Sequence, residues 1–442
     1  MELSSKPITK EADCFSMKKK QNKLTTTAVV MCALGAIFYC YEYYLRVAPS
    51  VMREELKGAF LLNEASFGYL AFSCYYFAYI IMQIPVGTMT DRFGPRRILT
   101  FACFLCAFGT YLFATTSQVW VAEIGRFLVG FGSAFAYVGA LKLSNIWLPR
   151  KYFAFMAGFC TALGMLGAMS GSITMSYLVG LMGWRPTLYY SVIIGFVLML
   201  ILWLVLRDTN KGVNIANSPS YKTAEIEEAV HQQFECLKEI MKSPQMWITG
   251  MIGCLTFLPI SGFAEAWAPS FLETVGMSKR DAANGTSMMF LGFALGGPIW
   301  GIISDKIKSR RFPLMVGSFI SASLMAWLIL FPSTSQSEMY CLLFLCAFFA
   351  SAEILIFAVS DDLSHSAVNA TAVAFINMIT MVGGFVLPWL IGKLLDNSLQ
   401  LVDDTPSLTT QDYSSALAVL PAALLLAGVL SCILKESYRR HY

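Results

Sequence analysis

Charged side chains interrupt several long apolar stretches of this 442-residue chain. Burying a charge in hydrocarbon costs a few kcal/mol, so each of these residues needs a physical reason to be there. Arginine binds a carboxylate or another anion through two parallel hydrogen bonds, and a glutamate removed from water readily takes up a proton. The pattern therefore indicates a buried site for a small ion or for proton exchange. The residues concerned are Glu42, Arg46, Arg126, Glu265 and Glu353.

Glu42 and Arg46 are four positions apart and so share one face of a helix, with the acid nearer the N-terminus. Glu123 and Arg126 form a similar acid–base pair at a spacing of three. Two interpretations stay open. The charges are either structural pairs that join helices, or a binding site in which Arg46 and Arg126 hold an anionic group of a ligand. In a binding site, Glu42 or Glu265 would face an ammonium group of that ligand.

Aromatic and acidic neighbours extend the candidate site. Tyr39 and Tyr43 flank Glu42, and their rings can stack on a ligand or bind its cationic group, although such rings more often pack between helices. Glu265 and Glu353 are the candidates for carrying a proton, because a carboxyl group away from water favours its neutral form. The alternative for Glu353 is a permanently protonated side chain that is hydrogen bonded to a neighbouring group.

Twelve apolar stretches supply the helices that carry these residues. With 56% hydrophobic and 14% charged residues, the chain has too little charge to cover a soluble domain of its length. Each stretch is close to the roughly 20 residues that cross a bilayer core. The sequence therefore predicts an all-α membrane protein. The predicted spans are 25–51, 65–89, 98–116, 119–147, 152–178, 186–206, 246–270, 284–304, 312–331, 339–360, 368–394 and 413–434.

A polar stretch between spans six and seven divides the predicted helices into two groups of six. If the N-terminus is inside, 23 of the 32 lysines and arginines fall in cytoplasmic segments and six fall outside. This bias predicts that both termini are cytoplasmic. The expected domains are a tail at 1–24, a bundle at 25–206, a cytoplasmic linker at 207–245, a second bundle at 246–434 and a tail at 435–442.

The loop after the second span recurs after the eighth. Residues 87–97 read GTMTDRFGPRR and residues 301–311 read GIISDKIKSRR, although the second copy lacks the glycine after the acid. An acid at a helix end can pair with basic groups or a helix N-terminus and release them when two halves move, so a gate is predicted here. Alternatively, the basic residues only fix the topology. The predicted gating residues are Asp91, Arg92, Arg96, Arg97 and Asp305.

These features resemble the major facilitator superfamily over residues 25–434. Its loop signature GxxxDRxGxRR is present at 87–97, and its RxxxGxG motif is present at 126–132. The resemblance implies two pseudo-symmetric six-helix bundles around a central cavity, which is lined by helices one, four, seven and ten and has Arg126 in its wall. If the loop at 87–97 is the predicted gate, Asp91 would stabilise the outward-open state.

The run YEYYLRVAPSVM at 41–52 looks like the first helix of a narrower group, the phagosomal amino-acid and nucleoside importers of intracellular bacteria. That group is distantly similar to lysosomal dipeptide carriers. This narrower resemblance implies a protein of a bacterial inner (plasma) membrane.

Enzyme chemistry finds no support in the sequence. The chain has no GxxxxGK[ST], HExxH or GxSxG motif, and its 12 cysteines and three histidines follow no metal-ligand spacing. We therefore expect no enzyme activity, no cofactor and no metal site. A net charge of +4, spread over short loops, argues against a nucleic-acid partner. The expected partners of a monomeric chain are a small-molecule substrate, protons and the lipid bilayer.

Taken together, these features predict a secondary active transporter that moves an amino acid, a short peptide or an organic anion with protons by alternating access. A cavity with both arginines and glutamates fits a zwitterionic or anionic metabolite. Three alternatives stay open: a nucleoside or sugar importer that uses Gln83 and Asn377, a drug or siderophore efflux pump, and a receptor of the same fold that does not transport.

Overall fold

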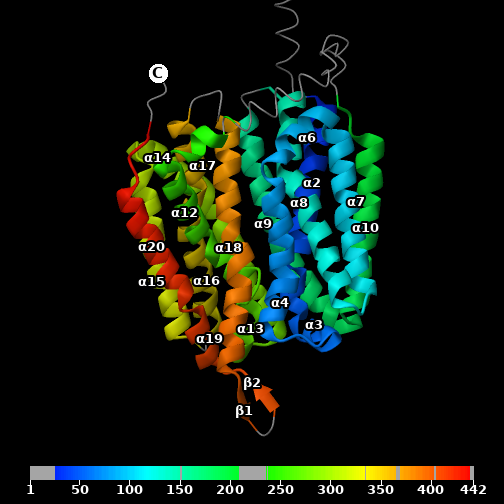
Figure 1. The fold of residues 1–442 in the computed structure, drawn as a ribbon, viewed down its shortest axis with the longest axis vertical. Coiled ribbons are helices and arrows are strands. Elements are labelled where there is room, and N and C mark those ends of the chain that lie inside the picture. Colours follow the sequence, from blue (N-terminus) through cyan, green and yellow to red (C-terminus); the bar gives the residue numbers. More distant parts are fainter. Residues whose placement is uncertain are drawn as a thin grey trace, which may run out of the picture.

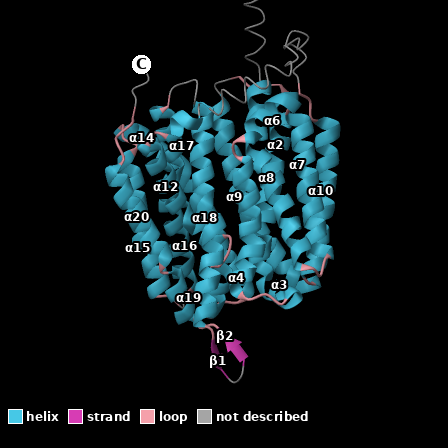
Figure 2. Ribbon diagram, viewed as in Figure 1, coloured by secondary structure: helices cyan, strands magenta, loops and turns pink. Residues whose placement is uncertain are grey.

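The computed structural model describes residues 25–149, 152–208, 235, 237–333, 335–364, 369–402 and 405–438. Within these residues, 12 helices are long and apolar enough to cross a membrane, so the predicted all-α membrane architecture is confirmed. One short antiparallel strand pair, β1 (Gln400–Val402) and β2 (Thr405–Ser407), was not predicted (Figure 2).

The first six spans form one bundle, which lies beside the bundle of the last six (Figure 1). The elements of the first bundle are α2 (Thr26–Val47), η1 (Ala48–Met52), α3 (Arg53–Phe60), α4 (Glu64–Gly68), η2 (Tyr69–Ser73), α5 (Cys74–Met82), α6 (Pro85–Phe93), α7 (Pro95–Thr115), α8 (Val119–Trp147), α9 (Phe153–Met182) and α10 (Trp184–Val205). Those of the second are α12 (Pro244–Leu258), η5 (Pro259–Ala264), α13 (Ala268–Thr274), α14 (Lys279–Ile307), α15 (Arg311–Leu330), α16 (Gln336–Ala350), η6 (Ser351–Ile354), α17 (Leu355–Leu363), α18 (Asn369–Ser398), α19 (Thr410–Leu417) and α20 (Val419–Ile433).

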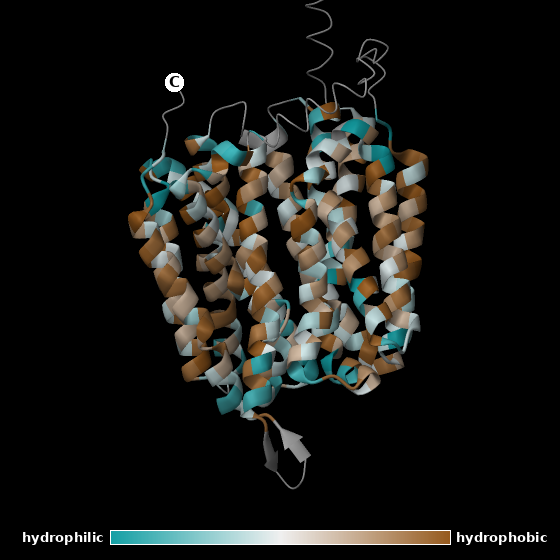
Figure 3. Cartoon of the chain, in the orientation of Figure 1, coloured by the Kyte–Doolittle hydropathy of each residue, from teal (hydrophilic) through white to brown (hydrophobic). Residues whose placement is uncertain are grey.

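The two ends of the molecule differ. Helix α2 begins and α20 ends at the same end, which we call the terminal end (Figure 1). The opposite end carries α3, α4, α13 and the strand pair, and we call it the hairpin end. Hydrophobic residues predominate along the helices between the two ends, while hydrophilic residues gather at the ends (Figure 3). The chain is therefore an integral membrane protein, with its large exposed apolar side chains facing lipid.

Four spans contain an irregular turn. Spans one and ten pass through the 3-10 turns η1 and η6, and spans two and seven pass through the π-helical turns η2 and η5. Proline at the start of η1 and η5 removes a backbone donor, which favours such a break. The helical segment of span one does not end at residue 51 as predicted but continues through η1 and α3 to Phe60. The breaks lie beside the charged residues: Glu265 follows η5 and Glu353 lies within η6.

Glycines let the two bundles approach closely at the hairpin end. A Cβ atom on Gly68 of α4 would collide with the backbone carbonyl of Pro388 in α18. One on Gly392 of α18 would collide with the carbonyl of Glu64. Spans two and eleven therefore meet backbone to backbone at this end, which small residues allow in membranes.

Candidate functional site

The centre of the first bundle holds a closed ring of three side chains. Arg46 donates from Nη2 to the Glu42 carboxylate at 2.9 Å and from Nε to the Tyr75 hydroxyl at 2.9 Å. The Tyr75 hydroxyl in turn donates to the second oxygen of Glu42 at 3.0 Å. Arg46 is only 1% exposed and Glu42 is fully buried. The pair that the four-residue spacing predicts is present, and Tyr75 of the second span completes it.

Glu265 of the second bundle contacts this ring. One carboxylate oxygen accepts a hydrogen bond of 2.5 Å from the Tyr76 hydroxyl. The other lies 3.7 Å from Nη1 of Arg46, within ion-pair range but too far for a hydrogen bond. Nη1 of Arg46 and Oε1 of Glu265 are both buried and have no hydrogen-bond partner. The contact between the two bundles at the centre therefore contains an unfilled donor and an unfilled acceptor.

Arg126 is buried without a carboxylate. Its guanidinium donates to two backbone carbonyls, from Nε to Ala71 at 2.8 Å and from Nη1 to Leu45 at 3.2 Å. Nη2 has no partner, and no carboxylate of the described residues lies within ion-pair distance of Arg126. The structural alternative, a pair between Glu123 and Arg126, is not formed. A buried guanidinium with a free donor is suited to receive an anion.

Aromatic rings surround the two arginines. The Arg46 guanidinium carbon lies 4.0 Å from the ring centre of Tyr43, and 5.4 Å from that of Tyr79. Arg46 and Arg126 each lie 5.2 Å from the Tyr75 ring centre, so the two cations share this ring. These distances fall within the range of cation–π attraction, which helps to hold cations in a dry interior.

Tyr39 lies at the edge of this group. Its hydroxyl is 3.5 Å from that of Tyr43, and its ring packs 5.3 Å from the ring of Tyr137. Tyr39 therefore reaches the arginines only through Tyr43. This is the packing role that the sequence leaves open beside ligand stacking.

Glu353 does not belong to the central cluster. It lies in η6 of span ten, is 5% exposed, and makes no hydrogen bond or ion pair with any side chain among the described residues. The structure joins Glu42, Arg46 and Glu265 directly and places Arg126 beside them through Tyr75, but it leaves Glu353 apart. The charged residues thus form one cluster and one separate acid.

Comparison with known proteins identifies the family to which the chain belongs. The family model described as "Major Facilitator Superfamily" matches residues 30–388. The chain belongs to the major facilitator superfamily. It is accordingly a membrane transporter with a small-molecule substrate and not an enzyme.

Two relatives and one solved structure illustrate the relationship. The probable galactarate/D-glucarate transporter GudP of Escherichia coli is 23% identical, over 96% of both chains. The probable sulfoacetate transporter SauU of Cupriavidus necator is 24% identical, over 64% of this chain and 65% of its own. A bacterial homolog of the human lysosomal transporter Spinster, solved in an inward-facing, occupied conformation, shares the fold with a TM-score of 0.73 at 17% identity. It covers 93% of this chain and 96% of its own.

Two tyrosines of this transporter were missed by the sequence analysis. Both lie in span two: Tyr75 donates a hydrogen bond to Glu42 of the first bundle, and Tyr76 donates one to Glu265 of the second. Their spacing in the sequence could have identified them, because residues 75, 76, 79 and 83 are polar or aromatic and share one face of an apolar helix. Gln83 on that face accepts a hydrogen bond of 2.6 Å from Asn377 of the other bundle.

The predicted gating loops are bonded within their own bundles. Arg96 donates to the Trp203 carbonyl at 2.8 Å, and its backbone N–H donates to Asp208 at 2.8 Å. Asp305 pairs with Arg310 at 2.7 Å. Arg92 and Arg97 are exposed at the surface, and the side chain of Asp91 lies outside the part of the chain that the structure describes.

Gly94 makes the first of these turns possible. Its φ of +79° is a conformation that residues with a side chain avoid. The Asp208 carboxylate occupies the place that a Cβ atom would take. This explains why the loop signature has glycine at this position: the loop must bend sharply around an acid that binds the start of α7.

Proposed function

We propose that this transporter imports a small organic anion together with a proton. The observation that carries the proposal is Arg126, a buried guanidinium with a free Nη2 and no carboxylate partner among the described residues. A carboxylate or sulfonate on the substrate would supply the missing acceptor. The names of the relatives point the same way, because galactarate, glucarate and sulfoacetate are all organic anions.

The bonding of the acids favours an anion over an amino acid. Both oxygens of Glu42 are already taken, one by Arg46 and one by Tyr75. Glu265 is held by Tyr76 and directs its free oxygen toward Arg46. Glu42 is thus fully engaged, and the free oxygen of Glu265 faces the Arg46 cation, which would repel a substrate ammonium group, whereas Nη2 of Arg126 is free to hold an anionic one.

Charge balance explains why a proton would accompany the substrate. Arg46 and Arg126 carry two positive charges, and Glu42 and Glu265 carry two negative charges, so the empty centre is neutral. A bound monoanion would leave an excess negative charge in a dry interior, which is costly. The substrate also competes with Glu265 for Arg46, because their 3.7 Å contact contains no hydrogen bond. Glu265, released from Arg46, then takes up the proton, which removes one negative charge: this balances a monoanion in full and a dianion such as glucarate by half.

Glu353 is the second candidate for a proton-carrying group. Its buried carboxyl group meets no cation among the described residues, which supports a neutral, protonated form. We expect Glu353→Gln to uncouple uptake from the proton gradient if Glu353 lies on the proton's path. Uptake that keeps its full dependence on the gradient in this variant would leave Glu265 as the carrier.

We propose that the terminal end faces the cytoplasm of a bacterial cell and that the chain works as a monomer in the inner membrane. The lysines and arginines of the predicted cytoplasmic segments support this orientation. Of the proposed cytoplasmic segments, the tail 1–24, the linker residues 209–234 and the final residues 439–442 lie outside the described part of the chain. With this orientation, the close contact of the bundles at the hairpin end supports an inward-facing arrangement.

Asp91 would act in the opposite, outward-facing state. There its carboxylate pairs with groups of the other bundle at the terminal end, and Arg92, Arg96 and Arg97 help to place the loop. Asp91→Asn should slow transport far more than it weakens substrate binding, because the change affects the movement and not the site. Loss of binding with normal turnover would remove Asp91 from the gate.

Uptake into proteoliposomes tests the proposed substrate class. Purified protein should accumulate radiolabelled glucarate, galactarate or sulfoacetate when the outside is more acidic than the inside, and a proton ionophore should abolish this accumulation. A thermal-shift panel of amino acids, dipeptides, nucleosides and organic acids identifies the best ligand beforehand. Stabilisation by amino acids or nucleosides, with none by organic acids, would contradict the proposal.

A further inference from the structure

Side chains and backbone groups of the two bundles bind each other at the hairpin end. Lys279 at the start of α14 pairs with Glu55 of α3 at 2.6 Å. Asp396 in the last turn of α18 accepts hydrogen bonds from the backbone N–H groups of Glu64 and Ala65, at 2.8 and 2.9 Å. Each contact joins the first bundle to the second, and each includes a full charge. They close the hairpin end of the transporter.

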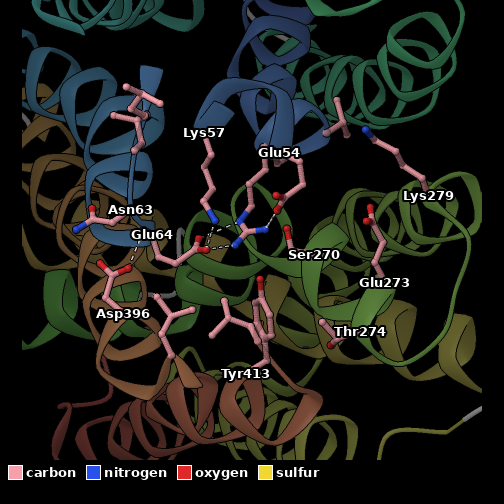
Figure 4. A pocket seen from close by; sticks show the side chains of 17 residues that line it. Glu54, Lys57, Asn63, Glu64, Ser270, Glu273, Thr274, Lys279, Asp396 and Tyr413 are labelled. Atoms are coloured by element: carbon pink, nitrogen blue, oxygen red, sulfur yellow. Dashed lines mark hydrogen bonds and ion pairs between the residues drawn. The ribbon is translucent and has the colours of Figure 1, made fainter. Parts of the chain in front are cut away.

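A network of charges around the buried side chains of Arg53 and Glu64 supports these contacts from the first bundle. Arg53 bonds to both Glu54 and Glu64, and Lys57 also bonds to Glu64 (Figure 4). The network borders a cavity of about 820 Å³ that residues of both bundles line, among them Ser270 and Tyr413. The cavity lies at the hairpin end, outside the central cluster. We call this cavity the vestibule, because it lies in front of the closed contact between the two bundles.

Trp267 packs on Arg53, one of the residues that line the vestibule, and follows Glu265 of the central cluster by two positions. Its side chain is completely buried, with its ring 5.8 Å from that of Phe67 and 5.7 Å from the Arg53 guanidinium, both in the first bundle. A tryptophan that serves as a lipid-interface anchor would be exposed, so Trp267 has another role. Its indole N–H has no hydrogen-bond partner, which is unusual for a buried tryptophan.

Trp267 and Glu265 are two residues apart, directly after the π-helical turn η5. Glu265 binds Arg46 and Tyr76 of the first bundle, and Trp267 packs on Phe67 and Arg53 of the same bundle. A short irregular segment therefore holds both the central contact and the tryptophan that packs behind Arg53 at the vestibule. Movement of this segment changes both together.

We propose that Trp267, with the contacts of Lys279 and Asp396, forms the gate at the hairpin end and that Glu265 controls it. While Glu265 is held by Arg46 and Tyr76, Trp267 stays against Phe67 and the gate is closed. When Glu265 is released, the segment after η5 moves, the indole leaves Phe67, and its N–H gains a partner in the opened vestibule. The gate requires only that the two bundles move against each other and does not depend on which substrate is carried.

Labelling of introduced thiols in detergent-purified, full-length protein tests this gate from both sides. Ser270→Cys reports on the vestibule, since Ser270 lines it and is only 8% exposed. Asn377→Cys reports on the terminal half of the interface between bundles. A water-soluble maleimide is the probe, and protein without the introduced thiol gives the background from native cysteines.

Asp396→Asn should speed labelling of the vestibule reporter by about tenfold, because it weakens two charge-assisted hydrogen bonds across the gate. The same variant should slow labelling of the terminal reporter, because alternating access closes one end when the other opens. The matched control is Asp412→Asn, which removes a carboxylate that caps α19 within its own bundle. This control should change neither rate.

A double-mutant cycle tests the control by Glu265. Glu265→Gln should also speed labelling of the vestibule reporter, whereas in a Trp267→Ala background the same change should have no further effect. Faster labelling of both reporters would show that the variants only loosen the fold and would overturn the gate. Equal effects of Glu265→Gln with and without Trp267 would overturn the link between centre and gate.

Discussion

Arg46 and Arg53 lie seven residues apart on span one, are both buried, and belong to two charged clusters that differ in how fully their polar groups are bonded. At the hairpin end, Arg53 bonds to Glu54 and Glu64, so its charge is fully compensated. At the centre, Nη1 of Arg46, Nη2 of Arg126 and Oε1 of Glu265 are buried without hydrogen-bond partners. Buried polar groups in proteins are normally bonded, so a group of unfilled ones needs an explanation. The complete cluster holds elements in place, and the incomplete cluster has room for a ligand.

The largest expected difference in uptake is between variants of Arg126 and variants of Arg53. Arg126→Lys should lower uptake by roughly 100-fold, because an ammonium group cannot hold two carbonyls and still present a planar pair of donors to an anion. Arg53→Lys should reduce turnover less than tenfold, since Lys57 already shares Glu64 with it. Initial uptake rates in proteoliposomes, at equal amounts of folded protein, measure both. Normal uptake by Arg126→Lys would end the distinction between the clusters.

The next effect separates Glu265 from Glu64. Glu265→Gln should abolish accumulation driven by a pH gradient yet keep exchange of substrate, because the amide fills the site but carries no proton. Glu64→Gln should keep the gradient dependence and lower the melting temperature, since it leaves Arg53 and Lys57 poorly compensated. Counterflow, gradient-driven uptake and thermal unfolding distinguish the two. If Glu64→Gln were also uncoupled, the hairpin-end cluster would belong to the proton path.

A smaller effect is expected from the hydroxyl of Tyr76. Tyr76→Phe removes the 2.5 Å hydrogen bond to Glu265, a bond to a charged group, and should change the transport rate by about tenfold. Tyr413→Phe, at the wall of the vestibule, should change the rate by less than about threefold. The comparison uses one reconstitution and one substrate concentration below KM. Equal effects would mean that both hydroxyls are merely structural.

The smallest effect is expected at Tyr39. Its hydroxyl has only a 3.5 Å contact with Tyr43, so Tyr39→Phe should alter KM by less than about twofold. Tyr43→Phe serves as the partner variant, because the ring that faces Arg46 remains in place. A tenfold rise in KM for Tyr39→Phe would place Tyr39 back among the residues that touch substrate.

The helices and part of the centre follow from the sequence. Hydropathy predicts the spans, because a bilayer demands a certain apolar length whatever the helices pack against. The bond between Glu42 and Arg46 follows from helical spacing alone. Arg126 could be placed near them only through a family motif. Its hydrogen-bond partners are the backbone carbonyls of Ala71 and Leu45, and no pattern of side chains in the sequence predicts such partners.

Contacts between distant parts of the chain could not be predicted. Asp396 binds backbone N–H groups more than 300 positions away, and every sequence has such groups. Tryptophan is a residue type typical of interface anchors, yet the packing of the two bundles buries Trp267 completely. Glu353 was expected beside the other charges, but depth along a helix does not determine which way a side chain faces.

The π-helical turn η2 has a consequence for how span two can move. Such a turn holds one residue more than an α-helical turn, and that surplus can pass to a neighbouring turn by exchange of a backbone hydrogen bond. Each such step rotates the segment it crosses by about 100° while the helix ends keep their positions. Tyr75 and Tyr76 lie in the first turn of α5, which begins where η2 ends, so a single shift of register would swing both hydroxyls away from Glu42 and Glu265 without unwinding the helix.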